Sequence, residues 1–395
     1  MLPAIKVRVH TMENGVPENG FSKPVVTEDS VRELLSRLYG IREARLTAFD
    51  SYDDVSYRVR TAAGEGTEGG QDLVLKVLNA TVTSHGPGAV ATQMAILDHL
   101  VRTFPGLRCQ VPVANLQGDL LSLHMIPNLW PGKEKSVEAL SAVRLYRYIP
   151  GKVMWDVSPL PSDLFFEAGR HLADLQLALQ TFPGDTGPLR TKACVHPFCL
   201  DNVPALEDHL SLVREPARRQ VVREVLTEFA AEVLPLHGQL RQGIVHHDFN
   251  ENNVLVAPYI GSEGEAPTAF RVCGILDFDE MVHTCLVYEI AVSMMYLGQC
   301  SEQPLDAMGR LLAGFEAVAP LPPVERRLLR CLVAARYVQS LVLGLLTDQL
   351  HPGNGYVLST QAKGWSILEL VWSKSQAELT SLWDHIASSN NASTP

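Results

Sequence analysis

Apolar and polar residues alternate with two different periods along the chain, and the position where the period changes divides the chain into two parts. Up to about residue 147, short apolar runs bounded by turn-forming residues predict β-strands, with helical spacing at 27–40 and 89–104. Beyond that point apolar residues recur every three or four positions over long segments, which is typical of amphipathic helices. The pattern predicts an α+β fold, in which an antiparallel sheet with a helix precedes a larger, mainly helical part.

The expected elements can be placed by residue number. The strands of the first part are expected at 44–50, 55–62, 72–80, 111–115, 120–126 and 141–149. The helices of the second part are expected at 161–182, 203–240, 287–299, 304–318, 324–350 and 364–387, interrupted by one hairpin within 253–278. We therefore divide the chain into a leader at 1–26, an N-terminal lobe at 27–147, a C-terminal lobe at 148–387 and a disordered tail at 388–395.

Composition and charge narrow the choice of partners. The 395 residues are 46% hydrophobic and carry a formal net charge of -11, without a cluster of Lys or Arg. Nucleic acids and anionic membranes are bound through concentrated positive charge, so we expect neither, and a small-molecule partner is favoured. No apolar stretch has signal-peptide length or approaches the ~18 residues of a membrane span, so we expect a cytoplasmic protein. The seven cysteines form no C-x-x-C pair, as expected of reduced thiols.

A glycine-rich segment offers a first candidate for phosphate binding. Gly64, Gly66 and Gly69 spell G-x-G-x-x-G. A dinucleotide-binding loop must follow a strand and open a helix, whereas this segment lies between two expected strands and carries Glu65 and Glu68, which repel phosphate. We interpret the segment as a hairpin tip.

Three polar clusters on strand-like runs carry the stronger signal. Lys76 stands in the middle of LVLKVL, where its ammonium either needs a partner or reaches water from an edge strand. In GIVHHDFNENNVLVAP, His246, Asp248 and Asn253 have the spacing H-x-D-x-x-x-x-N, and Asp277 heads D-F-D after the next strand. Phosphoryl transfer requires an Asp that accepts a hydroxyl proton, and an Asn and a second Asp that hold Mg²⁺. The joint pattern predicts a kinase site with Asp248 and His246 as catalytic residues and Asn253 and Asp277 as metal ligands.

Other chemistries are less well supported. His246 and Asp248 could merely satisfy backbone groups in a buried turn, but this leaves Lys76 unexplained. His246, His247, His283 and Cys285 match no established zinc spacing, and G-x-S-x-G is absent, so neither a zinc site nor a serine nucleophile is expected.

These motifs bring a family resemblance. Lys76, the connector YRYIPG at 146–151, HHDFNENN and ILDFDE follow one another as in the aminoglycoside phosphotransferase-like, or choline kinase-like, small-molecule kinases, over about residues 28–375. More narrowly, SYDD, ILDFDEM with YEIAVSMMYL, LAGFEAVAPL and RYVQSLV followed by KGW resemble the hydroxylysine kinase family. The resemblance implies a two-lobed, protein kinase-like fold and a cytoplasmic enzyme that phosphorylates 5-hydroxy-L-lysine with GTP as donor, ATP being the alternative.

The resemblance also implies roles for single residues. Lys76 would contact the α- and β-phosphates, and Mg²⁺ would be held by Asn253 and Asp277. The expected nucleotide contacts from the turn and the connector are Ser51, Tyr52, Asp53, Arg147, Tyr148 and Ile149. Two positions depart from the family. Its helix Glu, which pairs with the strand Lys, should lie near Ala91, where AVATQMAILD offers none, and His247 stands where the family usually has Gly.

The acceptor is expected to be a small cationic amino alcohol. An acidic strip of Asp277, Asp279, Glu280 and Glu289 suits ammonium groups, with Asp279 or Glu280 facing one of them. Arg336, in an apolar helical segment, is the candidate for binding the acceptor carboxylate, its alternative being a structural ion pair.

Two classes of function remain open at this stage. One is a kinase of hydroxylysine or of another amino alcohol, such as choline, homoserine or an aminoglycoside. The other is a pseudokinase-like binding protein, which the missing Glu favours, although the base, the Asn and the metal Asp are all present.

Overall fold

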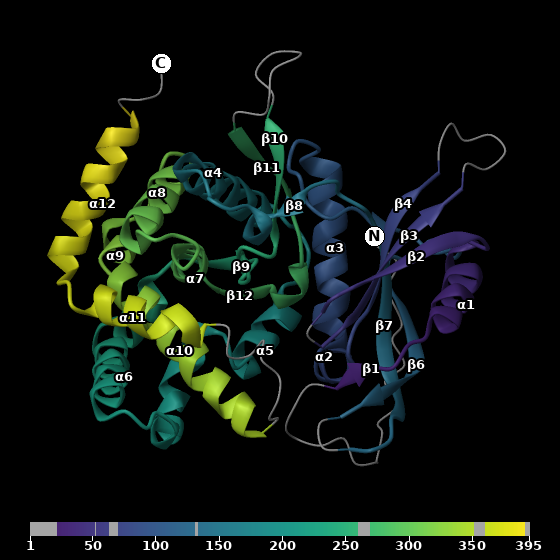
Figure 1. The fold of residues 1–395 in the computed structure, drawn as a ribbon, viewed down its shortest axis with the longest axis horizontal. Helices are drawn as coiled ribbons and strands as arrows, with labels where there is room; N and C mark the ends of the chain where they lie inside the picture. The colour runs from purple at the N-terminus through teal and green to yellow at the C-terminus, as the bar shows by residue number, and fades with distance from the viewer. Residues whose placement is uncertain are drawn as a thin grey trace.

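The computed structural model describes residues 22–51, 53–62, 70–130, 133–259, 269–350 and 360–391, and Figure 1 shows them as two lobes. The N-terminal lobe, purple to blue, is built on one antiparallel sheet, and the C-terminal lobe, teal through green to yellow, is mainly helical. This is the predicted α+β architecture. The glycine-rich segment at 64–69, most of the leader and Tyr52 lie outside the described residues.

The sheet of the N-terminal lobe has the strand order β1-β6-β7-β4-β3-β2, with β5 beside β7. The strands are β1 (Lys23–Pro24), β2 (Ala44–Phe49), β3 (Val55–Thr61), β4 (Asp72–Val77), β5 (Pro112–Val113), β6 (Ser122–Leu129) and β7 (Val137–Arg147). Each strand predicted in this lobe is present, and β1 was not expected. The order puts β4, which carries Lys76, between β3 and β7, so that Lys76 and Arg144 are register partners in the centre of the sheet.

Two helical segments pack against the sheet from different sides. The helix α1 (Glu28–Tyr39) begins at Thr27, whose side chain accepts a hydrogen bond from Ser30 N, and ends at Gly40, where a φ of 70° favours glycine. Its buried residues share one core with Val59, Leu75 and their neighbours on the sheet. The helices α2 (Ala80–His85) and α3 (Pro87–Thr103) follow β4, and α3 lies between the sheet and the C-terminal lobe in Figure 1.

Five short strands form two small sheets in the C-terminal lobe. The hairpin of β10 (Val254–Tyr259) and β11 (Ala269–Ile275) was predicted, and β8 (Lys152–Val153) adds to its edge. The pair of β9 (Gln242–Val245) and β12 (Val282–Cys285) was not predicted as a ladder. Together they place the loop at 246–253 and the loop after Ile275 at the same end of the two sheets, next to the N-terminal lobe.

Helices surround these strands. They are η1 (Met154–Asp156), α4 (Ser162–Leu179), α5 (Gly187–Val195), η2 (Leu200–Leu212), α6 (Pro216–Glu228), η3 (Phe229–Val233), η4 (Leu234–Gln239), η5 (Phe278–Glu280), α7 (Val287–Gly298), α8 (Pro304–Glu316), α9 (Pro323–Arg326), α10 (Leu329–Leu350), α11 (Gln361–Trp372) and α12 (Gln376–Asn391). The single helix expected over 203–240 is broken into several pieces, one of them containing Pro204, and α5 was missed.

The helices α4 and α8 cross in very close contact because glycine stands at both crossing positions. A Cβ on Gly169 would lie 2.0 Å from Leu311 O, and one on Gly314 would lie 1.9 Å from Phe166 O. A side chain at either position would force the helices apart, so these two glycines fix how α8 sits on the lobe.

Two expectations for the C-terminal part need correction. The first is that no apolar stretch approaches the length of a membrane span. The helix at Leu329–Gln349 has that length and composition, but 72% of that window is buried inside the protein, as in a core helix. The helix α12 continues to Asn391, into the range where a disordered tail was expected, because Leu379, Trp383 and Ile386 anchor it on the core.

Candidate active site

A cavity of about 1330 Å³ is lined by half of the predicted site residues, namely Asp53, Lys76, Asp248, Asp277, Asp279, Glu280 and Arg336. Its lining comes from β4 and the turn before β3, from the loop at 247–252, from η5 and from α7 and α10. Segments far apart in sequence therefore meet at one place.

Lys76 is the centre of a buried ion cluster. Its Nζ lies 3.1 Å from Asp54 Oδ2, 3.1 Å from Asp277 Oδ1 and 2.7 Å from Asp279 Oδ2, and its side chain is 12% exposed. Burial alone would lower the pKa of Lys76, but the three carboxylates outweigh burial and raise it well above its usual range. Lys76 is therefore a paired cation facing the cavity and not a lysine that reaches water from an edge strand.

The partner that the helix near Ala91 lacks is supplied from elsewhere. Arg144 and Lys76 both contact the carboxylate of Asp279, and Arg144 is fully buried. Gln93 on α3 donates to Asp279 O over 2.7 Å and accepts from Arg144 Nη2 over 3.4 Å. The helix thus contacts this cluster through an amide, while carboxylates from two other segments pair with Lys76.

This arrangement corrects the role expected for Asp279. One carboxylate oxygen contacts Lys76 and the other contacts Arg144. Burial alone would raise the pKa of this carboxyl, but the two cations outweigh burial and hold the pKa below its usual range. Its bonding capacity is therefore used inside the protein, and it does not face a substrate ammonium. Sequence reasoning missed Arg144, although an Arg within the apolar run SAVRLY was a visible signal.

Asp248 lies at the start of the loop that follows β9. Its Oδ1 accepts from Asn250 Nδ2 over 2.9 Å and its Oδ2 accepts from Asn253 Nδ2 over 2.7 Å. Burial, with the charges of Glu280 and Asp277, raises the pKa of Asp248 well above its usual range. A carboxylate held by two amides and made more basic in this way is suited to accept a proton.

Asn253 and Asp277 lie at the ends of adjoining segments. Leu276 N donates to Asn253 O over 2.8 Å, and Asp277 has the left-handed φ of 56°, unusual for a residue other than glycine. The amide nitrogen of Asn253 is used on Asp248, while its side-chain oxygen accepts no hydrogen bond from the described residues. An amide oxygen and a carboxylate are the hard donors that Mg²⁺ prefers, so these residues fit the predicted metal.

The structure assigns His246 a different place from the one predicted. The side chain is buried outside the cavity lining, its Nε2 lies 2.9 Å from Leu276 O, and its Nδ1 accepts from Asp248 N over 3.3 Å. Its ring also packs edge-on against Phe278, with 4.7 Å between centroids. Burial lowers its pKa to about 4, so the ring is neutral near pH 7. Both ring nitrogens of His246 thus hold the two loops in place, and its role in catalysis stays a prediction.

Glu289 is also removed from the expected acidic strip. It is fully buried on α7, where its carboxylate accepts from the backbone N–H of His246 and of His247. Burial raises its pKa to about 7. Its carboxylate holds the backbone at the start of the loop at 246–253. A single Glu in the apolar run VYEIAVSMM was the sequence signal for that role.

The predicted nucleotide contacts are only partly brought together. Asp53 lines the cavity beside Asn79, whose Nδ2 donates to it over 2.9 Å, and Ser51 Oγ donates to Asp54 O over 2.6 Å. The connector residues Arg147, Tyr148 and Ile149 join the lobes but are not part of the cavity lining. Their contact with a nucleotide stays a prediction.

Arg336 is buried in the wall of the cavity without an ion pair. Its Nη1 donates to Phe198 O over 2.6 Å and to Gln339 Oε1 over 2.8 Å, and its Nη2 donates to Tyr296 Oη over 2.9 Å. Within the described ranges no carboxylate lies at ion-pair distance from it, and its Nε lacks an acceptor. The alternative of a structural ion pair is therefore not supported, and the guanidinium remains available to an anionic group.

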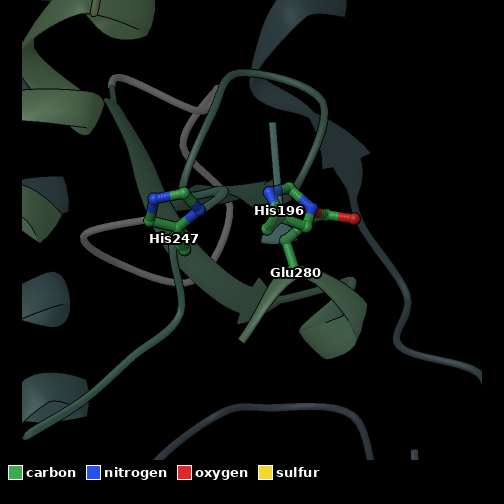
Figure 2. A group of neighbouring side chains, drawn as sticks. All are labelled: His196, His247 and Glu280. Carbon is green, nitrogen blue, oxygen red and sulfur yellow. The ribbon is translucent and has the colours of Figure 1, made fainter. Parts of the chain in front are cut away.

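Figure 2 shows a cluster of side chains of the types that bind metals, made of His196, His247 and Glu280. Their donor atoms lie within 4.8 Å of one another, close enough for a metal. However, Phe198 N donates to His196 Nδ1 over 3.2 Å, so the proton of His196 resides on Nε2, which contacts Glu280. This tautomer favours an imidazole–carboxylate hydrogen bond over coordination. Both ring nitrogens of His247 are buried and have no hydrogen-bond partner among the described residues, and its φ is 69°.

Glu251 is a site residue that sequence reasoning missed. It lies in the catalytic loop, lines the cavity, and has a buried Oε2 without a hydrogen-bond partner. Burial raises its pKa to about 7. Nothing in the sequence distinguished Glu251 from the Asn residues beside it.

Comparison with known proteins agrees with this geometry. Residues 46–321 match the model of the phosphotransferase enzyme family. Hydroxylysine kinase of Bos taurus is 32% identical over 381 residues, which cover 95% of this chain and 97% of that protein. Hydroxylysine kinase of Mus musculus is 32% identical over 372 residues, covering 93% of this chain and 95% of that protein.

Solved structures share the fold at lower identity. A microcompartment-associated aminopropanol kinase superposes with a TM-score of 0.61 at 16% identity, covering 90% of this chain and 98% of its own. An amicoumacin kinase in complex with AMP-PNP, Ca²⁺ and Ami superposes with a TM-score of 0.62 at 14% identity, covering 90% of this chain and 97% of its own. The two-lobed, kinase-like fold is thereby shown.

The family match spans most of the chain, and the motifs that carry it meet at one cavity. The chain belongs to the phosphotransferase enzyme family and, within it, to the hydroxylysine kinases, as a small-molecule kinase with an alcohol group as acceptor.

Proposed function

We propose that this protein transfers the γ-phosphoryl group of GTP, or of ATP, to the hydroxyl of 5-hydroxy-L-lysine in the cytoplasm. The observation that carries the choice of acceptor is the buried guanidinium of Arg336, which has no carboxylate partner in the described chain and lines the same cavity as Asp248. The names of the relatives support the same acceptor.

In this proposal Asp248 removes the acceptor's hydroxyl proton. The hydroxyl oxygen forms a bond to the γ-phosphorus while the bond from that phosphorus to the bridging oxygen breaks, and the nucleoside diphosphate leaves with the bond's electrons. Asn250 and Asn253 hold the carboxylate in place by their amides. The raised pKa of Asp248 makes it a stronger base than a solvated Asp.

The donor is held on the opposite wall of the cavity. Lys76 contacts the phosphates, with Ser51, Tyr52, Asp53 and the connector residues as further nucleotide contacts. Asn253 and Asp277 hold Mg²⁺, which when bound neutralises negative charge on the phosphates. Asp54 and Asp279 keep Lys76 charged and in position before the donor arrives.

The acceptor's charged groups are bound by residues other than the base Asp248. Arg336 binds the carboxylate through its two-pronged guanidinium, and Glu280 faces the α-ammonium, with His196 fixing the Glu280 carboxylate. Choline and aminoglycosides have no carboxylate to offer Arg336. The pseudokinase alternative loses its motivation, because Lys76 has carboxylate partners without a helix Glu.

A phosphotransfer screen tests the proposal. Purified protein with Mg²⁺ is given GTP or ATP and one of hydroxylysine, lysine, choline, homoserine or kanamycin, and phosphorylated product is measured. We expect hydroxylysine to be phosphorylated far better than the other compounds. Better turnover of choline or kanamycin would exclude hydroxylysine as the acceptor while leaving a small-molecule kinase.

A further inference from the structure

Glu251 has the properties of a ligand-binding carboxylate that awaits its cation. Its side chain lines the cavity, and Oε2 is buried without a hydrogen-bond partner. An unpartnered buried carboxylate is costly to retain, more so than a neutral group of the same size. A bound cation would remove that cost, whereas a purely structural role would have supplied a partner from within the protein.

The carboxylate of Glu251 accepts a hydrogen bond from its own backbone N–H, while the described residues offer it no cation. Across the described ranges of the chain, no Lys, Arg or His side chain lies within ion-pair distance of Glu251. The groups whose protonation its charge affects are Tyr296, Cys300 and Tyr337, all uncharged near neutral pH. The backbone is nevertheless fixed, because Trp155 N donates to Glu251 O over 3.0 Å. The carboxylate is therefore held at a defined place with its charge uncompensated.

The place of Glu251 relates it to the reacting hydroxyl. It follows Asp248 by three residues in the loop HHDFNENN, and both side chains line the cavity. Both act electrostatically on Tyr296, whose hydroxyl accepts from Arg336. The cavity wall thus carries, around Tyr296, a base for a hydroxyl, a carboxylate for a cation and a guanidinium for an anion.

Glu280, another acidic residue of the cavity, is assigned to the other end of the acceptor. Glu280 contacts His196, and its charge acts on His247, which also senses Arg336. Glu280 and Arg336 therefore both lie near His247, as suits an α-ammonium and an α-carboxylate carried by one carbon atom. This leaves Glu251 without a counterpart among the α-substituents.

We propose that Glu251 binds an ammonium group on the carbon adjacent to the carbon that bears the acceptor hydroxyl, so that the enzyme selects 1,2-amino alcohols. The proposal rests on the proposed function, since it takes Asp248 as the residue that marks the hydroxyl. In 5-hydroxylysine this group is the ε-ammonium on C6, next to C5, which carries the reacting oxygen. Glu251 thereby distinguishes hydroxylysine from hydroxylated amino acids that lack the second amine.

The test compares wild-type protein with Glu251→Gln, which keeps size and removes charge. The compounds are hydroxylysine, 2-amino-5-hydroxyhexanoic acid, which lacks the ε-amine, and 6-amino-5-hydroxyhexanoic acid, which lacks the α-amine. Each analogue is measured as a competitive inhibitor of hydroxylysine phosphorylation, so that it need not turn over. Wild-type activity on hydroxylysine reports on the proposed function separately, before any variant is made.

The expected result is a selective loss. Glu251→Gln weakens hydroxylysine and 6-amino-5-hydroxyhexanoic acid by about 10²-fold, as for the loss of one partner of a buried charge pair, and leaves 2-amino-5-hydroxyhexanoic acid within about twofold. The KM for the nucleotide is unchanged. The melting temperature is unchanged or higher, because an unpartnered carboxylate has been removed.

The matched control is Glu302→Gln. Glu302 also lines the cavity, but its side chain is 93% exposed and pairs with Lys363 over 3.0 Å, so we expect no change in any of these constants. Three results would each overturn the proposal: equal weakening of all three compounds, weakening confined to those that carry an α-amine, or a loss of stability with unchanged inhibition constants, which would make Glu251 structural.

Discussion

The two walls of the active-site cavity treat buried charge in opposite ways. On the wall facing the sheet, Lys76 contacts three carboxylates and Arg144 shares one of them, that of Asp279, so both cations are paired within the protein. On the acceptor wall, the described residues supply no ion-pair partner to Arg336, Glu251 or His247, and each has a buried polar atom without a hydrogen bond. Removing one partner of a buried ion pair destabilises the folded protein, whereas a buried charged group without a partner is stabilised when a ligand pairs with it. The first wall is therefore built to hold its own geometry, and the second to be completed by a ligand.

The largest effect is expected at the base that stands between the walls. Asp248→Ala should lower kcat by about 10²- to 10⁴-fold, because proton removal from the acceptor is lost, while nucleotide affinity and the melting temperature are kept. Steady-state kinetics and nucleotide titration measure this. Asp306→Asn is the control, since Asp306 also lines the cavity but already pairs with Arg310 over 2.7 Å. Retained turnover in Asp248→Ala would remove Asp248 from the mechanism.

The wall facing the sheet should respond to mutation with a loss of stability. Asp279→Ala leaves Lys76 and Arg144 short of a partner, and the free energy of unfolding should fall by about 3–5 kcal/mol. Urea unfolding measures it. Asp72→Ala, which removes the partly exposed partner of Arg58, should cost less than about 1 kcal/mol. If both variants lost the same small amount, the sheet-side cluster would not be a rigid unit.

The acceptor wall should respond with a loss of substrate affinity. Arg336→Ala should raise the KM for hydroxylysine by about 10- to 10²-fold with little change in the KM for GTP, and Arg336→Lys should recover part of the loss. Arg330 is the matched control on the same helix, because it is nearly as buried but pairs with Glu228 over 2.8 Å outside the cavity lining. Arg330→Ala should lower stability and leave both KM values unchanged. A parallel rise of both KM values in Arg336→Ala would point to a general distortion.

A smaller effect is expected at Glu289, beneath both walls. Its folded pKa of about 7 lies above the ordinary value because of burial, so the folded state binds the proton more tightly than the unfolded state. The stability it contributes is therefore fully present below about pH 4.5 and is lost as pH rises through about 7. Glu289→Gln should remove this slope, so that the variant gains on wild type between pH about 5 and about 8. Parallel urea-unfolding curves against pH for the two proteins would contradict this.

Sequence reasoning predicted the sheet-side wall better than the acceptor wall, for a physical reason. Donor chemistry depends on residues at fixed spacing on strands and one loop, so Lys76, Asp248 and Asp277 could be found from local patterns. Partners reached through tertiary contact left weak signals. Asp54 pairs with Lys76 in place of the helix Glu, Arg144 shares Asp279 with Lys76, and both come from segments distant from Ala91.

The misplaced residues illustrate the same limit. His246 and Asp279 stand in the right motifs, but only the packing of Leu276 and Arg144 against them reveals that their bonds are already used. Glu251 shows the reverse case. Its motif position carries no signal, and its importance follows from the absence of a partner, which a sequence cannot display.

The most direct test of the account is a crystal structure with hydroxylysine, Mg²⁺ and a non-hydrolysable GTP analogue. The account predicts the acceptor hydroxyl within hydrogen-bond distance of Asp248, its carboxylate on the guanidinium of Arg336, and the sheet-side contacts of Asp279 with Arg144 preserved. A complex in which the hydroxylysine carboxylate lies away from Arg336, with Arg336 still bonded only to Phe198, Gln339 and Tyr296, would contradict the central claim that the acceptor wall is completed by its substrate.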